Sequence, residues 1–450
     1  MNSRTNQDLK KRNRLRQQFG LALTFGKWTI LGAWVGVLAG LASALFLWAF
    51  NSATAYRGTH PWLLYLLPLA GVAIAFLYTR YGKEVAGGNN LILDRIHDPS
   101  AVIPFRMAPM ILITTVVTHL FGGSAGREGS AVQMAGTLAN MTVGPLKMSK
   151  EDHRILLMTG IAAGFGSVFG TPLAGAIFGL EVLSIGRIRY DALIPCLVGS
   201  IVGDIVCRGV GITHHHYDAA VSFTLTPTIF FSVLLVGALF AGASALFAEM
   251  THALQHVGKS LRYSTYLRPM IGGAIVIALT LIAGSQIYNG LGLELIEKSF
   301  SLPAQSPSVF LIKIIFTAIT LGFGFKGGEV TPLFCIGATL GSAFAGFTNQ
   351  DPALYAALGF VAVFAGAANT PLACTIMGIE LFGSHLAVPI AMACVVAYIL
   401  SGHRGIYSSQ RIDQPKSYAS KFDEDTTLKG VWERRNRIRS RYLAVRKSDS

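Results

Sequence analysis

Charged residues are scarce in this sequence, which excludes an ordinary soluble protein. Only 13% of the 450 residues are Asp, Glu, Lys or Arg, 52% are hydrophobic, and the mean hydropathy is +0.51. Soluble domains carry roughly 25% charged residues. Residues 28–50 contain no charge and exceed the about 20 apolar residues that a spanning helix needs. Later apolar segments are shorter or broken by Gly and Pro, so we expect a polytopic membrane protein with tilted and re-entrant helices.

The sequence also lacks two patterns that are common in metal-dependent proteins. It contains no HExxH motif and no CxxC pair. The five cysteines stand in apolar segments and are expected to be small buried residues, neither disulfides nor metal ligands. An intramembrane enzyme would need a nucleophile with a base, or a metal pair, at membrane depth. We therefore expect no enzyme, no cofactor and no metal.

Acidic residues are fewer than basic ones, 23 against 37, and the formal net charge is +14. Much of the excess lies in an N-terminal tail, residues 1–27, and in a polar C-terminal tail, residues 411–450. The positive-inside rule places both tails in the cytoplasm, in a multi-pass protein of the cell (inner) membrane. Nucleic-acid binding is the weaker interpretation, because basic runs beside a span usually meet anionic lipid head groups. No secretory signal is expected, since a long polar start precedes the first apolar run.

One carboxylate stands inside the glycine-rich, apolar stretch 122–136. Glu128 follows a glycine cluster and precedes a run that reads as an apolar helix. A charge inside a membrane segment is costly, so it usually faces the protein interior or a wet cavity and marks an ion pathway. The start of a helix favours an anion. A carboxylate placed there can compete with a transported anion and can take up a proton, which indicates anion transport.

A second copy of this pattern lies in residues 325–340. Glu128 precedes Gly136 by eight residues (136 − 128), and Glu329 precedes Gly337 by eight (337 − 329). The two glutamates are 201 residues apart (329 − 128). A near-constant offset between matching motifs predicts a duplicated half.

The motif TPLA supports the same duplication. It begins at residues 171 and 370, an offset of 199 (370 − 171), and each copy starts ten residues before a glutamate, Glu181 or Glu380. We assign residues 28–225 to a first transmembrane repeat and 226–410 to a second. In transporters such halves are often inverted, with the site at their interface. Glu181 and Glu380 are expected to be structural acceptors of hydrogen bonds.

Several polar residues allow two interpretations each. Asn89 is either a helix N-cap or an amide donor to an anion. Tyr407 follows the last apolar segment and is either an interfacial anchor or a hydroxyl that reaches inward. Lys326 either pairs with a glutamate or adds positive potential. The run His214–His216 is more consistent with a polar loop than with a metal site. His119 is more consistent with a hydrogen-bonded interior residue than with a ligand.

The segments between the apolar runs are expected to be irregular. Polar loops are predicted at 51–60 and 147–154, and a longer polar connection is predicted at 285–307. The tail before residue 26 is expected to be partly helical.

Four motifs in order resemble the CLC family of anion channels and anion/proton antiporters. They are GREGS (126–130), TPLAGAIFGLE (171–181), GGEVTP (327–332) and GIYSS (405–409). The resemblance covers roughly residues 28–410. It implies an all-α polytopic membrane protein with the CLC-type inverted-repeat fold, and a homodimer with a separate pathway in each subunit.

Three departures from the usual CLC motifs resemble the fluoride/proton antiporter branch of the family. Asn89 stands where the family's GSGIP motif has a coordinating serine. Glu329 replaces an aliphatic residue, and Val182 stands where chloride/proton exchangers often carry an internal proton glutamate. The resemblance therefore implies fluoride export coupled to protons. Chloride transport, by an antiporter or a passive channel, stays open as the alternative.

The resemblance also implies roles for individual residues. Glu128 would be the gate and proton carrier. Glu329 would be a second member of the proton–anion coupling system, unless it only caps its helix. The expected anion-binding residues are Asn89, Gly129, Val330, Thr331 and Tyr407.

Overall fold

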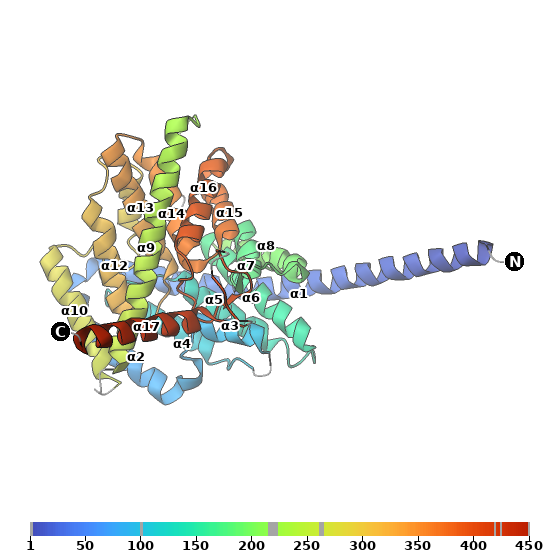
Figure 1. The fold of residues 1–450 in the computed structure, drawn as a ribbon. Helices are drawn as coiled ribbons and strands as arrows, with labels where there is room; N and C mark the ends of the chain where they lie inside the picture. The colour runs from blue at the N-terminus through green and yellow to red at the C-terminus, as the bar shows by residue number, and fades with distance from the viewer. Residues whose placement is uncertain are drawn as a thin grey trace.

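The computed structural model describes residues 3–99, 102–214, 224–260, 265–417, 420–423 and 425–448, and these residues are almost entirely helical (Figure 1). His215 and His216 lie outside them. The two short strands, β1 (Ser184–Ile185) and β2 (Arg411–Ile412), pair in parallel. This arrangement confirms the prediction of an all-α protein.

The first half contains eight α-helices among the described residues. They are α1 (Ser3–Thr59), α2 (Leu67–Tyr81), α3 (Asn89–His97), α4 (Met107–Leu120), α5 (Glu128–Met141), α6 (Lys150–Phe169), α7 (Pro172–Glu181) and α8 (Leu193–Gly209). Short 3₁₀ turns are η1 (Pro61–Leu66), η2 (Lys83–Val85) and η3 (Tyr190–Ala192).

The second half and the C-terminal region contain nine. They are α9 (Pro227–Ser260), α10 (Leu267–Ala283), α11 (Leu293–Ser299), α12 (Pro307–Gly322), α13 (Val330–Thr348), α14 (Pro352–Ala368), α15 (Pro371–Phe382), α16 (Ala387–Leu400) and α17 (Leu428–Ser448). A 3₁₀ turn, η4 (Ser384–Leu386), precedes α16.

Five described helical segments are long and apolar enough to cross a membrane. They are Asn13–Thr59, Pro61–Tyr81, Tyr190–Gly209, Pro227–Gly258 and Val330–Thr348. Seven further apolar helices have only 10 to 17 residues, so they are too short to cross upright. Broken helices at membrane depth are tolerated where protein buries their ends, which is the pattern that the sequence predicted.

The two halves break their helices in the same way. Gly170 ends α6 and Asn369 ends α14, each in the left-handed conformation, with φ of 74° and 59°. A threonine and then a proline follow in both cases, and the proline begins α7 or α15. Proline suits the first helical turn because its missing N–H would have no intrahelical partner there.

Two predicted loops are wrong. Residues 51–60 continue α1 almost to Pro61, since no proline or glycine pair interrupts them earlier. Part of 147–154 is helical, because the side chain of Ser149 caps α6 by accepting from the N–H of Asp152. The connection 285–307 contains α11. The N-terminal tail joins the first span as one helix, which projects away from the body of the molecule in Figure 1.

Small residues bring the central helices into close contact. A Cβ atom added to Gly337 on α13 would lie 1.9 Å from the carbonyl oxygen of Gly359 on α14, so the two backbones touch. Every residue of α14 is buried. In the first half a Cβ atom on Gly164 of α6 would lie 3.0 Å from the carbonyl oxygen of Ala131 on α5. Packing through small residues is typical of membrane helices. It places the starts of α5 and α13 in the centre of the molecule.

Candidate functional site

The two glycine-rich stretches meet backbone to backbone. The N–H of Gly126 donates to the carbonyl of Gly328 at 2.6 Å, and the N–H of Gly328 donates back to Gly126 at 2.7 Å. A Cβ atom on Gly328 would lie 2.9 Å from the amide nitrogen of Gly129, so a larger residue would separate the two stretches. The bridge holds the N-termini of α5 and α13 beside each other. The sequence could suggest this pairing only through the repeat.

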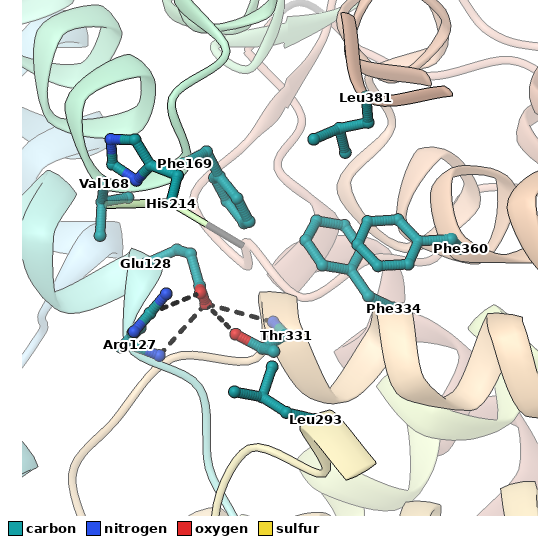
Figure 2. Close-up of a pocket in the computed structure, with 10 residues that line it drawn as sticks. All are labelled: Arg127, Glu128, Val168, Phe169, His214, Leu293, Thr331, Phe334, Phe360 and Leu381. Atoms are coloured by element: carbon teal, nitrogen blue, oxygen red, sulfur yellow. Dashed lines mark hydrogen bonds and ion pairs between the residues drawn. The ribbon is translucent and has the colours of Figure 1, made fainter. Parts of the chain in front are cut away.

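Glu128 is buried, with 2% of its surface exposed, and it is the first residue of α5. Its carboxylate reaches across to the other half (Figure 2). The oxygen Oε2 accepts from the N–H of Thr331 at 3.2 Å and from the Thr331 hydroxyl at 2.5 Å. It also accepts from the N–H of Arg127 at 3.1 Å, and Nε of Arg127 lies 3.6 Å from Oε1. The carboxylate thus occupies an anion position at the start of α13.

A pocket opens beside this carboxylate (Figure 2). Its polar lining is Glu128 with Arg127, Thr331 and His214, and its apolar lining is Val168, Phe169, Leu293, Phe334, Phe360 and Leu381. The rings of Phe334 and Phe360 stack with centroids 4.1 Å apart. An apolar flank makes an uncompensated charge costly, so a group that enters the pocket depends on the few donors present.

Asn89 lies beside Gly129, but the N-cap interpretation is wrong. Gly88 is the N-cap of α3, and no side chain caps that helix. A Cβ atom added to Gly129 would lie 2.8 Å from the Nδ2 atom of Asn89. The Oδ1 atom of Asn89 is buried without a hydrogen bond. The amide therefore lies against the start of α5 and does not cap the N-terminus of α3.

Asn90, the next residue, has a contact that sequence reasoning missed. Its Oδ1 atom accepts from the N–H of Ser409 at 3.0 Å. The segment around Tyr407 is also held by a bond from the N–H of Ile406 to the carbonyl of Ala367, at 2.9 Å. The adjacent pair Asn89 and Asn90 was the sequence signal for this contact. One amide of the pair faces Gly129, and the other faces the segment around Tyr407.

Tyr407 is buried, with 5% of its surface exposed, and it belongs to the hydrophobic core. Its ring contacts Phe178 edge-on with centroids 6.4 Å apart. This burial contradicts the interpretation as an interfacial anchor and favours the inward one.

Glu329 is the N-cap residue of α13, and its side chain is partly buried and makes no capping hydrogen bond. Val330 and Thr331 follow it in the first turn of α13 and are buried. Lys326 lies over the ring of Tyr78, with Nζ 4.2 Å from the ring centroid. Four of the predicted site residues, Glu128, Glu329, Val330 and Thr331, thus gather around one helix start.

Glu181 and Glu380 each bind the broken helix of the opposite half. Glu181 accepts from the N–H groups of Leu372 and Ala373 at 3.1 and 2.8 Å, at the start of α15. Glu380 accepts from the N–H groups of Leu173 and Ala174 at 2.9 and 2.8 Å, at the start of α7. The expected structural role is confirmed, and the partners are exchanged between the repeats.

Two buried basic residues support the loop before Glu128. The ring nitrogens of His119 lie 2.9 and 2.8 Å from the carbonyl oxygens of Thr115 and Ala125, as expected of a hydrogen-bonded interior histidine. Lys313 donates to the hydroxyl of Ser124 at 3.1 Å and to the carbonyls of Tyr288 and Gly290. The role of Lys313 was missed, although a lysine inside an apolar run was a signal.

Residues 122–126 also spell GxSxG, a pattern found around nucleophilic serines. Ser124 is fully buried, and its hydroxyl contacts Thr317 and Lys313. No histidine is among its hydrogen-bond partners in the described residues, so the geometry does not support a nucleophile.

The described residues contain no group of three or more metal-ligating side chains. His214, which belongs to the run 214–216, lines the pocket, and its Nε2 atom lies 3.5 Å from a carboxylate oxygen of Asp204. It lies in an irregular segment after α8, as the loop interpretation expected, although its side chain is buried.

The chain matches known proteins over most of its length. The family model described as voltage gated chloride channel matches residues 70–402. A chloride/fluoride channel protein of Pseudomonas syringae pv. tomato is 50% identical over 411 residues, which cover 89% of this chain and 90% of the relative. The H(+)/Cl(-) exchange transporter ClcA of Vibrio parahaemolyticus is 27% identical and covers 84% of this chain and 88% of its own length.

Solved structures share the fold. The crystal structure of a CLC-type fluoride/proton antiporter matches with a TM-score of 0.83 and 33% identity, over 86% of this chain and 98% of that one. A slow cyanobacterial Cl⁻/H⁺ antiporter matches with a TM-score of 0.74 at 21% identity, over 83% and 94%. With the paired helix starts, the four motifs and these matches together, the chain belongs to the CLC family of membrane anion transporters.

Proposed function

We propose that this protein is a fluoride/proton antiporter that exports fluoride. The observation that carries the proposal is the position of Glu128, whose carboxylate occupies the start of α13 against Thr331 while the Asn89 amide lies beside Gly129. The names of a 50% identical relative and of a structural neighbour at 33% identity, both of which include fluoride, support it.

Glu128 acts as gate and proton carrier in this proposal. Ionised, the carboxylate fills the anion position and blocks the pathway, held by Thr331 and the N–H of Arg127. Protonation removes its negative charge and with it most of the attraction to the helix start. The neutral side chain can then leave for the adjoining pocket, which frees the position for an anion and carries a proton between two environments.

The anion site consists of donors from both halves. The Asn89 amide and the backbone around Gly129 come from the first half, and Val330, Thr331 and Tyr407 come from the second. Fluoride is small and strongly hydrated, so a site must replace its water by strong, closely placed donors. A larger halide gains less from such a site, which gives selectivity by size and donor strength. Chloride transport is the alternative if these donors prove too far apart.

Glu329 is the second candidate for proton coupling. Val182 cannot carry a proton, whereas Glu329 begins α13 and makes no side-chain cap. It directly precedes Val330 and Thr331, two residues of the proposed anion site, so its protonation would change the charge beside that site. One proton moving down 100 mV is worth about 2.3 kcal/mol, which favours export coupled to proton entry.

The assembly and orientation follow the family and the charge distribution. We infer a homodimer with one pathway in each subunit, in the cell (inner) membrane, with both termini in the cytoplasm. Fluoride or chloride, protons and the lipid bilayer are the partners of this function, and nucleic acid is not one of them.

Anion and proton fluxes from loaded vesicles test the function. The protein is reconstituted into liposomes that contain either fluoride or chloride, and an ion electrode and a pH electrode record both fluxes. We expect fluoride efflux with simultaneous proton uptake, and much slower chloride efflux. Equal rates for the two anions would refute selectivity, and fluoride efflux without proton movement would refute antiport.

A further inference from the structure

The C-terminal helix α17 is strongly basic and is joined to the segment that carries Tyr407. Its sequence, residues 428–448, has eight Lys and Arg and one Glu, a net charge of +7 (8 − 1). Arg434, Arg437 and Ile438 are exposed, Ile438 by 61%. A helix with a cluster of Lys and Arg next to a membrane domain is typical of one that binds anionic lipid head groups.

One face of α17 is bound to the C-terminal end of α9 (Figure 1). The ring of Trp432 contacts His252 and His256 edge-on, with centroids 6.2 and 5.8 Å apart. Arg435 places Nη2 2.7 Å from an oxygen of Glu249, and the same oxygen accepts from Nε of Arg404 at 3.1 Å. Arg404 precedes Tyr407 by three residues (407 − 404), so one carboxylate links α17 to that segment.

The first turn of α17 is bonded directly to the backbone just after Tyr407. The N–H of Lys429 donates to the carbonyl of Ser408, and the N–H of Leu428 donates to that of Gln410, both at 3.0 Å. Leu428 and Val431 also share a hydrophobic cluster with Ile185 and Ile412. A displacement of α17 would therefore move or release the backbone that positions Tyr407.

We propose that α17 is a lipid-sensing helix, which binds anionic phospholipid head groups and thereby stabilises the docked position of the Tyr407 segment. Charge complementarity identifies the occupant, because α17 carries a net charge of +7 (8 − 1) and its side chains Arg434 and Arg437 are exposed. Anionic lipid then accelerates transport. This effect on rate rests on the proposed function, since Tyr407 belongs to its anion site, whereas the contact with lipid does not.

A spin label tests the contact. The five native cysteines are buried, so Ile438→Cys provides one accessible thiol. The full-length protein is reconstituted into phosphatidylcholine with or without about 30 mol % phosphatidylglycerol, and the accessibility of the label to oxygen and to a nickel chelate is measured. Phosphatidylglycerol should raise oxygen access and lower nickel access. The double variant Arg434→Gln with Arg437→Gln should reduce this response about fivefold or more.

Flux measurements test the coupling. Anion efflux should be about threefold faster with phosphatidylglycerol than without it, and Arg434→Gln with Arg437→Gln should abolish the difference while the rate in phosphatidylcholine stays unchanged. The matched control, Lys83→Gln with Lys150→Gln, removes two exposed charges elsewhere and should keep it. Arg435→Gln, which breaks the pair with Glu249, should uncouple the rate from lipid although the label still reports lipid contact.

The outcomes are decisive in each arm. A label that does not respond to phosphatidylglycerol, or that responds to a soluble oligonucleotide instead, overturns the lipid contact whatever anion the protein carries. A label that responds while the efflux rate does not overturns the coupling to Tyr407. Loss of the lipid response in the control pair would also overturn it, because the effect would then follow total charge.

Discussion

The two repeats have the same sequence pattern, but their central glutamates are used differently. Glu128 is buried and extends its carboxylate onto the helix start of the second repeat, where Thr331 donates two hydrogen bonds. Glu329 stands at the corresponding helix start, is only partly buried and makes no capping bond. In the proposed mechanism, the first half supplies the gate, Glu128, and the second half supplies the helix start that holds it.

The outer scaffold of the two repeats is symmetric by contrast. Glu181 binds the start of α15, and Glu380 binds the start of α7, each through two backbone N–H groups. The bridge between Gly126 and Gly328 is reciprocal as well. The comparison shows that the two halves share a backbone framework, while the side chains at its centre make different contacts.

The largest expected effect separates the two central glutamates. Glu128→Gln keeps the shape of the side chain but cannot carry a proton, so proton flux coupled to anion flux should fall by about a hundredfold or more. Glu329→Gln should lower the coupling without abolishing it. Both fluxes are recorded in anion-loaded liposomes. Undiminished proton coupling in Glu128→Gln would contradict the proposed role of that residue. It would also remove the proposed functional difference between Glu128 and Glu329.

The second prediction tests the symmetric part of the comparison. Glu181→Ala leaves two N–H groups of α15 without their acceptor in a buried place, and should lower the free energy of unfolding by about 2 kcal/mol. Glu380→Ala should cost about 1 kcal/mol, because Glu380 is more exposed. Thermal unfolding in detergent compares the two variants. A larger loss in Glu380→Ala would contradict the argument from burial.

The third prediction concerns the hydrogen bond between Thr331 and Glu128. Thr331→Val removes the hydroxyl bond to Glu128 but keeps the backbone N–H, so the ionised carboxylate is held less firmly. Anion efflux at neutral pH should rise about tenfold, as expected from the loss of one charged hydrogen bond. Thr137→Val is the matched control, since that hydroxyl donates to the carbonyl of Gln133 in its own helix. An unchanged efflux rate in Thr331→Val would show that the Thr331 hydroxyl does not restrain Glu128.

The smallest expected effect concerns the contribution of the first repeat to the anion site. Asn89→Ser shortens the side chain that lies against Gly129, and should lower the ratio of fluoride to chloride rates about fivefold. Asn90→Ser, at the neighbouring amide that binds Ser409, should affect this ratio less. Rates are measured with each anion separately. An unchanged ratio in Asn89→Ser would remove this amide from selectivity.

Much of the fold was predictable because the signals are local. Apolar runs, glycine–proline breaks and the repeated motifs located most helices and the start of α5 at Glu128. The loops predicted at 51–60 and 147–154 are wrong, since polar residues also continue helices where packing or the next proline decides the end. Asn89 was a plausible N-cap by residue type, yet Gly88 is the N-cap of α3. Residue type alone does not determine the backbone conformation that defines a cap.

The sequence by itself determined that this is a duplicated membrane protein with a carboxylate at a helix start, because composition, spacing and helix-breaking residues act over a few turns of chain. Only the tertiary structure decided which groups meet. Residues about 200 positions apart are joined by the hydrogen bond between Thr331 and Glu128 and by the exchanged hydrogen bonds of Glu181 and Glu380. Such pairs depend on how the two halves pack, and no local pattern specifies that packing.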